Sequence, residues 1–313
     1  IISAMMEVSK NEFIDIEGKT AEEAAAEKGE IFREVLQEAK KRESKKPDWG
    51  KRVRAGLEYR KSTEEHFPHY VREVTAQAEG AGIGPDEAWA LFLENEGENI
   101  PVGSVESVDG HHDTNNRPQR CTTVITNHGN LIGHREDWDP EMAETVRLMR
   151  IKVGGVVRVF LGYVDTLSGT SVTITKRDGK ISVQTINYFD HPEKPAGVPR
   201  NITARLFSEG HHPEEAARRM SEIPRSSGYN HNCVFKNGEP EVWNVEMTAK
   251  EVATRRIDMK GPFMHTNHYL DPRLMTADHG FDTVSSRIRY ARANILAKRR
   301  EEMSPDDMQS ILD

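Results

Sequence analysis

Two short runs joined by a turn decide the fold that we expect for this chain. They read Cys121-Thr122-Thr123-Val124-Ile125-Thr126, then the turn Asn127-His128-Gly129-Asn130, then Leu131-Ile132-Gly133-His134-Arg135-Glu136-Asp137-Trp138-Asp139. The first run alternates as a strand does, and the polar turn favours an antiparallel return strand. The second run carries acidic residues. The pattern therefore predicts a hairpin with a thiol at the head of one strand, beside a charged strand.

Cys121 at the head of this strand fits an N-terminal nucleophile, which becomes the first residue of a subunit when the chain cuts itself in front of it. The sulfur is then the nucleophile and the freed α-amine is the base. An α-amine titrates near about 7.7–8.0 and a free thiol near about 8.5, so proton transfer between them is nearly balanced at neutral pH. The alternative is a small buried apolar residue, the usual state of a lone cysteine. We expect that state for Cys233, the second of two cysteines.

The composition is that of an ordinary soluble protein. The chain has 313 residues, 30% of them charged and 36% hydrophobic, enough for one large domain or two smaller ones. The net charge of −8 argues against a general nucleic-acid binder. No apolar run reaches the roughly 18 residues of a membrane-spanning helix, and Ile1–Met6 is too short for a signal sequence. Two cysteines make no disulfide framework, which indicates a reducing, cytoplasmic setting.

Helical patterns predominate before residue 101. Thr20-Ala21-Glu22-Glu23 reads as a capping box, and apolar residues follow it at helical spacing as far as Ala39. A second helical pattern runs through residues 70–78, and Gly84-Pro85-Asp86 begins a third.

Strands predominate in the rest of the chain. Asp178-Gly179 and Asn237-Gly238 each lie between two strand-like runs, which predicts two hairpins. Helical pieces near 202–208 and 213–220 separate these hairpins, and a basic helix runs from Val284 to about Arg299. This order of hairpins and helices is typical of an α+β layered fold.

Five segments carry residues that a catalytic site would need. They are Cys121-Thr122-Thr123; Gly133-His134-Arg135-Glu136-Asp137 with Trp138-Asp139; Asn244-Val245-Glu246-Met247; His265-Thr266-Asn267-His268; and Ser285-Ser286-Arg287. In this order they resemble the acyl-CoA:6-aminopenicillanate acyltransferase family of N-terminal nucleophile hydrolases, over most of residues 121–290. The Gly-His-x-Glu-Asp and Asn-Val-Glu-Met patterns look similar to the branch of the insect β-alanyl-dopamine hydrolase. Trp138-Asp139 and His265–His268 look more like the penicillin acyltransferase branch.

The resemblance implies a four-layer αββα sandwich over residues 121–313. It also implies that residues 1–120 form a helical leader, which self-cleavage of the Arg120–Cys121 bond would separate, giving a heterodimer of the two fragments. The family continues beyond the point where this chain ends, so the last strands are expected to lie outside the sequence. The family usually has glycine before the nucleophile. Glycine tolerates the strained backbone that helps an N-to-S acyl shift, so Arg120 bears on the efficiency of cleavage.

The resemblance further implies roles for single residues. Cys121 would attack an amide or thioester carbonyl and carry the acyl group. Asp139 would lie near the nucleophile's amine, its alternative being an exposed hairpin residue. Asn267 resembles the family's oxyanion-stabilising asparagine, and Asn187 is a second candidate, with a strand-terminal turn residue as its alternative. Arg287 matches an arginine that stands near the nucleophile and favours the thiolate.

Four residues are expected to orient the substrate or to support the fold: Glu136, Asp137, Glu246 and His265. Acidic runs usually form solvated faces, which is the alternative for the first two. A buried Glu246 would need a partner. His265 and His268, three residues apart, have no third ligand at convincing spacing, so we expect no metal.

The remaining basic residues of the helix that begins near Val284 are expected to form a solvated face rather than a nucleic-acid patch. They are Arg289, Arg292, Lys298, Arg299 and Arg300.

We therefore expect a self-processing cysteine amidohydrolase that cleaves a linear amide bond, peptide-like or not, through an acyl-enzyme on Cys121. Its partner would be a small-molecule amide or acyl thioester, with no cofactor, nucleic acid or membrane. Hydrolysis is preferred because acyl transfer needs a second organised acceptor site. Two alternatives stay open. One is an acyl-CoA-dependent N-acyltransferase of the penicillin acyltransferase type, and the other is a non-catalytic binding protein left uncut because of Arg120.

Overall fold

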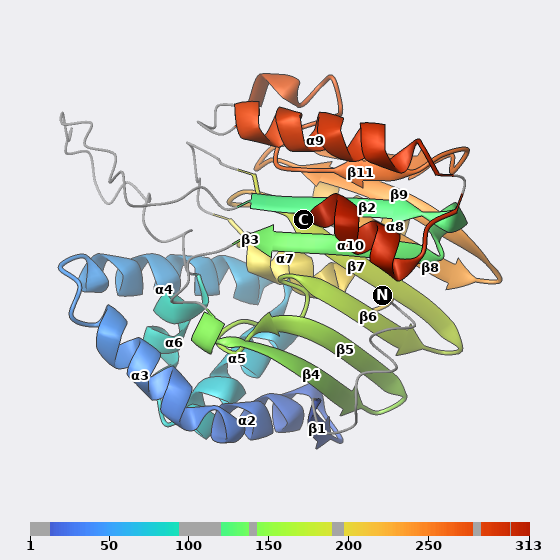
Figure 1. Ribbon diagram of the computed structural model, residues 1–313. Coiled ribbons are helices and arrows are strands. Elements are labelled where there is room, and N and C mark those ends of the chain that lie inside the picture. The colour runs from blue at the N-terminus through green and yellow to red at the C-terminus, as the bar shows by residue number, and fades with distance from the viewer. Residues whose placement is uncertain (1–12, 94–119, 138–142, 190–196, 278–282, 301) are drawn as a thin grey trace.

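The structure, a computed structural model, describes residues 13–93, 120–137, 143–189, 197–277, 283–300 and 302–313 (Figure 1). Within these ranges, no helix combines the length and the apolar character that crossing a bilayer requires.

An eight-stranded sheet runs through the centre of the molecule (Figure 1). Its strands, in spatial order, are β1 (Ile14–Gly18), β4 (Val146–Val153), β5 (Val156–Tyr163), β6 (Val172–Arg177), β7 (Lys180–Asn187), β8 (Asn230–Asn237), β9 (Glu239–Met247) and β10 (Val252–Ile257). Neighbours from β4 to β10 are antiparallel, whereas β1 pairs in parallel with β4. Both predicted hairpins are confirmed. The β6–β7 turn has Asp178 and Gly179 at φ 51° and 75°, as a tight two-residue turn requires, and the β8–β9 turn has Gly238 at φ 100°.

A second sheet has three strands. They lie in the order β11 (Phe263–His265), β2 (Arg120–Thr126) and β3 (Leu131–Asp137). The expected hairpin of β2 and β3 is confirmed, and it turns through the short helix η2 (Asn127–Gly129). Its register pairs Cys121 with Glu136. Strand β11 ends at His265, opposite Thr123, so the head of β2 extends beyond its neighbour on that side.

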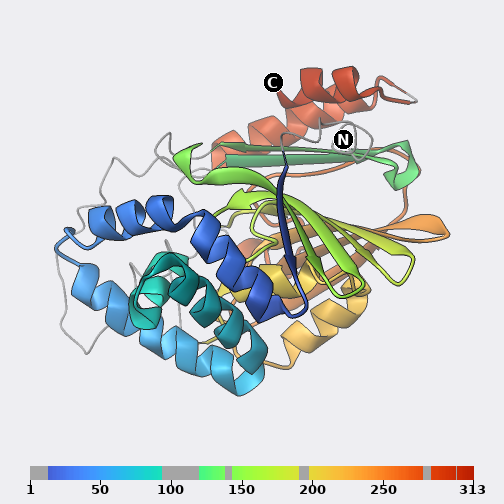
Figure 2. The same cartoon turned by 90° about the horizontal axis from the view of Figure 1, so that it is seen from below.

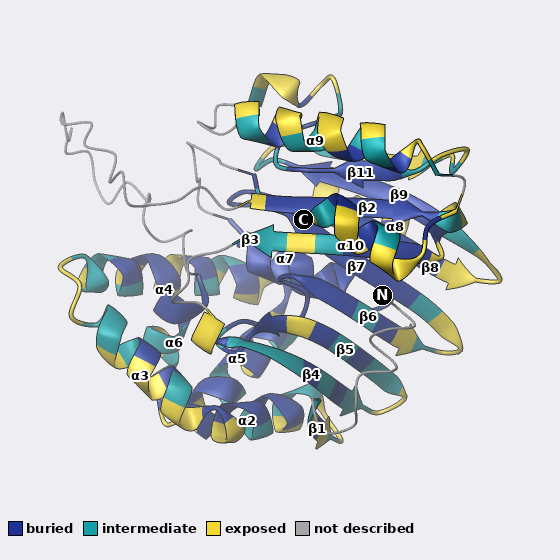
Figure 3. Ribbon diagram, in the orientation of Figure 1, coloured by how far each residue is buried: buried dark blue, intermediate teal, exposed yellow. Residues whose placement is uncertain are grey.

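The two sheets pack against each other. Ile125 and Ile132 of the smaller sheet share one apolar cluster with Val183, Val234 and Val242 of the larger sheet. Helices cover the opposite faces, as the two views show (Figures 1 and 2). They are α9 (Thr283–Ala297) and α10 (Pro305–Leu312) on the smaller sheet, and α7 (Arg200–Phe207), α8 (Pro213–Ser221) and several N-terminal helices on the larger. The protein is thus a mixed α+β protein. Its buried residues lie along central strands such as β7 and β8 and on α7, whereas β4 is mostly half-buried (Figure 3).

The N-terminal segment is mostly helical, as expected. Its helices are α2 (Ala21–Ile31), α3 (Arg33–Glu43), α4 (Trp49–His66), α5 (Pro68–Ala81) and α6 (Pro85–Phe92). Thr20 caps α2 by accepting a hydrogen bond of 3.1 Å from the Glu23 backbone N–H. The single helix expected as far as Ala39 is two helices, because the backbone leaves helical geometry at Phe32 (φ −102°, ψ 18°). The strand β1 that precedes α2 is not predicted by the sequence analysis.

A buried ion pair joins this N-terminal segment to the rest of the chain. The Arg205 guanidinium of α7 donates twice to the Glu73 carboxylate of α5, from Nη2 at 2.9 Å and from Nε at 3.2 Å. The two side chains are only 2% and 8% exposed. The guanidinium carbon also lies over the Tyr70 ring, 5.1 Å from its centre. The contacts between α5 and α7 are therefore polar as well as apolar.

Breaking this pair should destabilise the protein strongly. Arg205→Met leaves the Glu73 charge buried without its partner, so we expect a loss of about 3–5 kcal/mol in the free energy of unfolding, measured by urea denaturation. The double variant Arg205→Met/Glu73→Leu removes both charges and should recover most of that loss. A double variant as unstable as the single one would contradict this account.

Candidate active site

Cys121 is buried at the head of β2. Because β11 ends opposite Thr123, side chains rather than a neighbouring strand contact the backbone of Cys121 on that side. Its N–H donates to Asn267 Oδ1 at 2.8 Å, and its carbonyl oxygen accepts from Arg289 Nη1 at 2.6 Å. The same guanidinium donates to Thr122 Oγ1 at 3.0 Å and, through Nη2, to Asn267 Oδ1 at 2.8 Å. Both backbone groups of Cys121 are therefore held from the side of β11 and α9.

The arginine that contacts Cys121 is Arg289, not Arg287 as the sequence predicted. We expected Arg287 beside the nucleophile and placed Arg289 on a solvated face. In the structure Arg287 is exposed, whereas Arg289 is half-buried and contacts Cys121. Two residues along an α-helix rotate a side chain by about 200°, so a motif match displaced by two positions points to the opposite face.

Asn267 lies on the loop after β11, and α9 holds that loop through Ser286. The Ser286 hydroxyl accepts from the Asn267 backbone N–H at 2.7 Å and contacts His268 Nδ1 at 2.7 Å and Thr266 Oγ1 at 2.9 Å. Burial lowers the pKa of His268 to about 4, so its ring is neutral at physiological pH. The Asn267 side-chain nitrogen donates to the Tyr188 carbonyl at 2.9 Å. These contacts orient the amide oxygen of Asn267 toward the backbone nitrogen at the head of β2.

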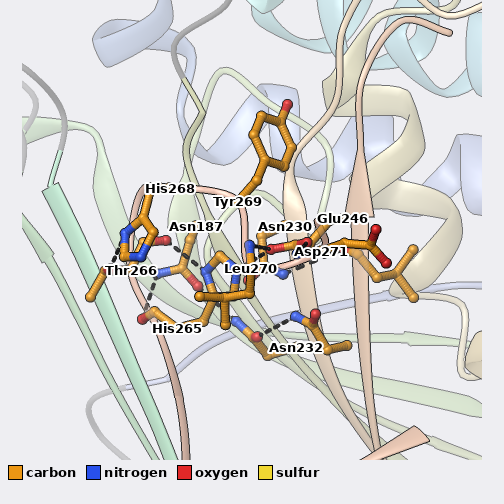
Figure 4. Close-up of polar contacts among 12 residues, drawn as sticks. Asn187, Asn230, Asn232, Glu246, His265, Thr266, His268, Tyr269, Leu270 and Asp271 are labelled. Carbon is orange, nitrogen blue, oxygen red and sulfur yellow. Dashed lines mark hydrogen bonds and ion pairs between the residues drawn. The ribbon is translucent and has the colours of Figure 1, made fainter. Parts of the chain in front are cut away.

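Glu246 and His265 form a buried pair on the other side of the same loop (Figure 4). Glu246 Oε1 lies 2.6 Å from His265 Nε2 and accepts from the Leu270 N–H at 2.7 Å, while Oε2 accepts from the Asp271 N–H at 2.7 Å. Burial raises the pKa of Glu246, but these hydrogen bonds outweigh it and hold the pKa below its usual value. His265 Nδ1 faces the Thr266 carbonyl at 2.7 Å. Both residues thus support the loop that carries Asn267.

Asn187, expected as a second oxyanion donor, is buried at the end of β7 (Figure 4). Its Oδ1 accepts from Thr123 Oγ1 at 3.1 Å and from Asn232 Nδ2 at 2.7 Å, and its Nδ2 lies 3.5 Å from the His265 carbonyl. Asn244 Nδ2 donates in turn to Asn232 Oδ1 at 3.2 Å. Both ends of the Asn187 amide are therefore engaged by protein groups where the two sheets meet.

The acidic end of β3 divides between two faces. Glu136 lies opposite Cys121, and its side chain is 14% exposed. Asp137 lies opposite Arg120 and pairs with Arg135 at 2.9 Å, both side chains being exposed. Since successive strand residues face opposite sides, only Glu136 of these two shares a face with Cys121. Asp139, expected near the amine, lies outside the described residues.

The thiol of Cys121 is protonated at neutral pH in the continuous chain. Burial raises its pKa to about 12, and the nearby Glu136 charge adds to the rise. Hydrogen bonds from the Tyr188 backbone and the Asn267 side chain, and the charge of Arg289, act in the opposite direction. The thiolate is the nucleophilic form, so this thiol needs a base before it can attack.

The two histidines considered above as possible metal ligands, His265 and His268, are both held by protein groups. His265 pairs with Glu246, and His268 contacts Ser286. Throughout the ranges that the structure describes, three or more histidine, cysteine, aspartate or glutamate side chains nowhere gather as metal ligands would. Cys233 is buried in the apolar core between the larger sheet and its helices, as expected.

The fold and the site define a mixed α+β protein built around a buried cysteine that polar groups hold on several sides. The chain belongs to the acyl-coenzyme A:6-aminopenicillanic acid acyl-transferase family, whose model matches residues 124–312. The matched residues include Glu246, Asn267 and Arg289, and the match begins three positions after Cys121. Members of this family are enzymes, either acyltransferases or hydrolases. A comparison with curated proteins finds no match.

Proposed function

We propose that this protein is a self-processing cysteine amidohydrolase of the N-terminal nucleophile type. The observation that carries the proposal is the environment of Cys121. Its nitrogen, carbonyl and thiol meet polar groups of Tyr188, which follows β7, of the loop after β11 and of α9. Two sheets packed between helices support an αββα arrangement of this type. The family match supports acyl-transfer chemistry.

The first reaction cuts the chain. The Cys121 sulfur attacks the carbonyl carbon of Arg120, the C–N bond breaks, and the thiol proton passes to the departing nitrogen. Asn267 Oδ1, which already accepts from that nitrogen at 2.8 Å, holds it in place. Water then hydrolyses the thioester, which frees the sulfur and leaves an α-amine on Cys121.

The second reaction turns over the substrate. The α-amine takes the thiol proton, and the sulfur attacks the amide carbonyl. The Tyr188 N–H and the Asn267 side-chain nitrogen lie near the sulfur and would donate to the oxyanion. The protonated amine leaves, and water resolves the acyl-enzyme. Besides the substrate, these steps use groups of the protein and water, and they call for no metal or organic cofactor.

The leader is expected to stay bound after the cut, giving a heterodimer of the two fragments. Strand β1 pairs with β4 along residues 14–18, and the Glu73–Arg205 ion pair crosses the same boundary. Separation would expose the sheet edge and break this buried ion pair, leaving Glu73 without the Arg205 guanidinium.

Acyl transfer is the second candidate, because the family's description names it. Adding a primary amine to the processed enzyme distinguishes the two candidates. A hydrolase releases the free acid, whereas a transferase gives a new amide.

Freshly purified protein should consist of two fragments, the second of which begins Cys-Thr-Thr. Attack by Cys121 at the Arg120 carbonyl gives this N-terminus and no other. Intact-mass measurement and N-terminal sequencing test it. A single stable chain after prolonged incubation would favour the uncut binding protein instead.

A further inference from the structure

Glu136 lies directly beside the thiol, on the side away from the Cys121 backbone groups. The N–H and the carbonyl of Cys121 both point to Asn267 and Arg289, so they do not bond to β3. In an antiparallel ladder this makes Cys121 and Glu136 a non-hydrogen-bonded pair, in which the side chains lie closest together. The backbone nitrogen of Cys121 thus faces one way, and the carboxylate flanks the thiol on the other.

Two hydroxyl groups hold this carboxylate in position. Tyr163 Oη, at the end of β5, donates to Oε1 at 2.7 Å, and Ser171 Oγ, just before β6, donates to Oε2. Both oxygens therefore act as acceptors, as those of an ionised carboxylate do. Neutral hydroxyls satisfy hydrogen bonds but bring no positive charge.

Among the residues that the structure describes, His134 lies close to this carboxylate, but its ring supplies no positive charge in the neutral form. His134 Nε2 lies 3.8 Å from Glu136 Oε2, beyond hydrogen-bond distance. Thr123 Oγ1 donates to Asn187 Oδ1, so His134 Nδ1, 2.9 Å from the same hydroxyl, carries the ring's proton. Nε2 of the neutral ring then has no proton to offer to Glu136.

We propose that Glu136 is the substrate-recognition carboxylate of this site and that it selects amides or thioesters carrying an ammonium group. This inference rests on the proposed function. A bound cation would complete the charge pair at Glu136 and offset the electrostatic effect that disfavours the thiolate. A neutral substrate would bury the carboxylate further without bringing a positive charge, at a cost in binding.

The first test compares matched amides on processed enzyme. The acyl group of 6-aminohexanoyl 4-nitroanilide ends in an ammonium group, and that of heptanoyl 4-nitroanilide ends in a methyl group. A second pair of amides has the same difference in the amine that leaves. In at least one pair we expect a kcat/KM about 10- to 100-fold higher for the cationic member, as for a hydrogen bond to a charged group. Glu136→Gln should reduce that ratio to about one.

Asp137→Asn is the matched control. It removes the same charge from the neighbouring residue of β3, but on the exposed face that pairs with Arg135. The preference for the cationic substrate should survive in this variant. A preference that Glu136→Gln keeps, or that Asp137→Asn loses equally, would overturn the proposal.

A second measurement does not depend on turnover. Methanethiosulfonate reagents with ammonium, neutral and sulfonate ends modify thiols, and mass spectrometry reports the rate at Cys121, normalised to a free small thiol. We expect the order ammonium, neutral, sulfonate in the wild-type protein. Equal rates for the three reagents would overturn the inference about Glu136. That result would not affect the proposed processing at Cys121. Failure of the proposed function itself appears separately, as the absence of the new N-terminus.

Discussion

Replacing Cys121 with alanine should leave one uncut chain and lower kcat by about 10⁶, the scale seen when a nucleophile is removed from a covalent catalyst. In the proposed mechanism the Cys121 sulfur both attacks the Arg120 carbonyl and carries the acyl group, so its removal should stop both reactions. A denaturing gel and intact mass report the cut, and release of free acid from an amide reports turnover.

Cys233→Ala is the control for this experiment. Cys233 is also buried, but it lies in the apolar core on the helix side of the larger sheet. Its replacement should leave processing and turnover unchanged. Cleavage that persists in Cys121→Ala would remove Cys121 from the role of processing nucleophile.

Asn267→Ala should lower kcat by about 10²–10³, the effect of losing one oxyanion donor. It should also slow self-cleavage, because the amide oxygen no longer holds the Cys121 nitrogen. An interaction made mainly in the transition state lowers kcat and kcat/KM together. Steady-state kinetics on processed enzyme measure both constants.

Asn267→Asp separates the two halves of this amide. The aspartate keeps an oxygen that can accept from the Cys121 nitrogen and from Arg289, but it loses the N–H that would meet the oxyanion. We expect processing closer to wild type than in Asn267→Ala, with turnover still impaired. A rise in KM with kcat intact, in either variant, would make Asn267 a binding or structural residue.

The hairpins could be predicted because their signals are local. Asp178-Gly179 and Asn237-Gly238 lie between strand-like runs, and a tight turn needs the positive φ that Asp178, Gly179 and Gly238 adopt. Strand β1 could not be predicted in this way. Its five residues pair with β4, more than 130 positions later, and no nearby turn announces a parallel partner.

The site could be predicted only as far as motifs specify it. Cys121 and Asn267 come together as the resemblance implies, and Glu246 and His265 pair in support of the loop. Arg289 was misplaced because a linear match does not show which face of α9 meets β2. The anchoring of the loop by Ser286 depends on packing between elements that the motifs treat separately.

The parallel pairing of β1 with β4 bears on the order of folding and the proposed cleavage. Strand β1 precedes Cys121 in the chain, yet it lies in the same sheet as strands that follow it. If the chain cleaves itself before Cys121, the sheet must be complete before that cleavage, because the groups around Cys121 come together only in the folded chain. If the two fragments were made as separate chains, they would have to find each other in solution before the sheet could form, a step that the single chain avoids. Under the proposed self-cleavage, the bond before Cys121 would hold the two parts together until folding ends and would not be needed afterwards.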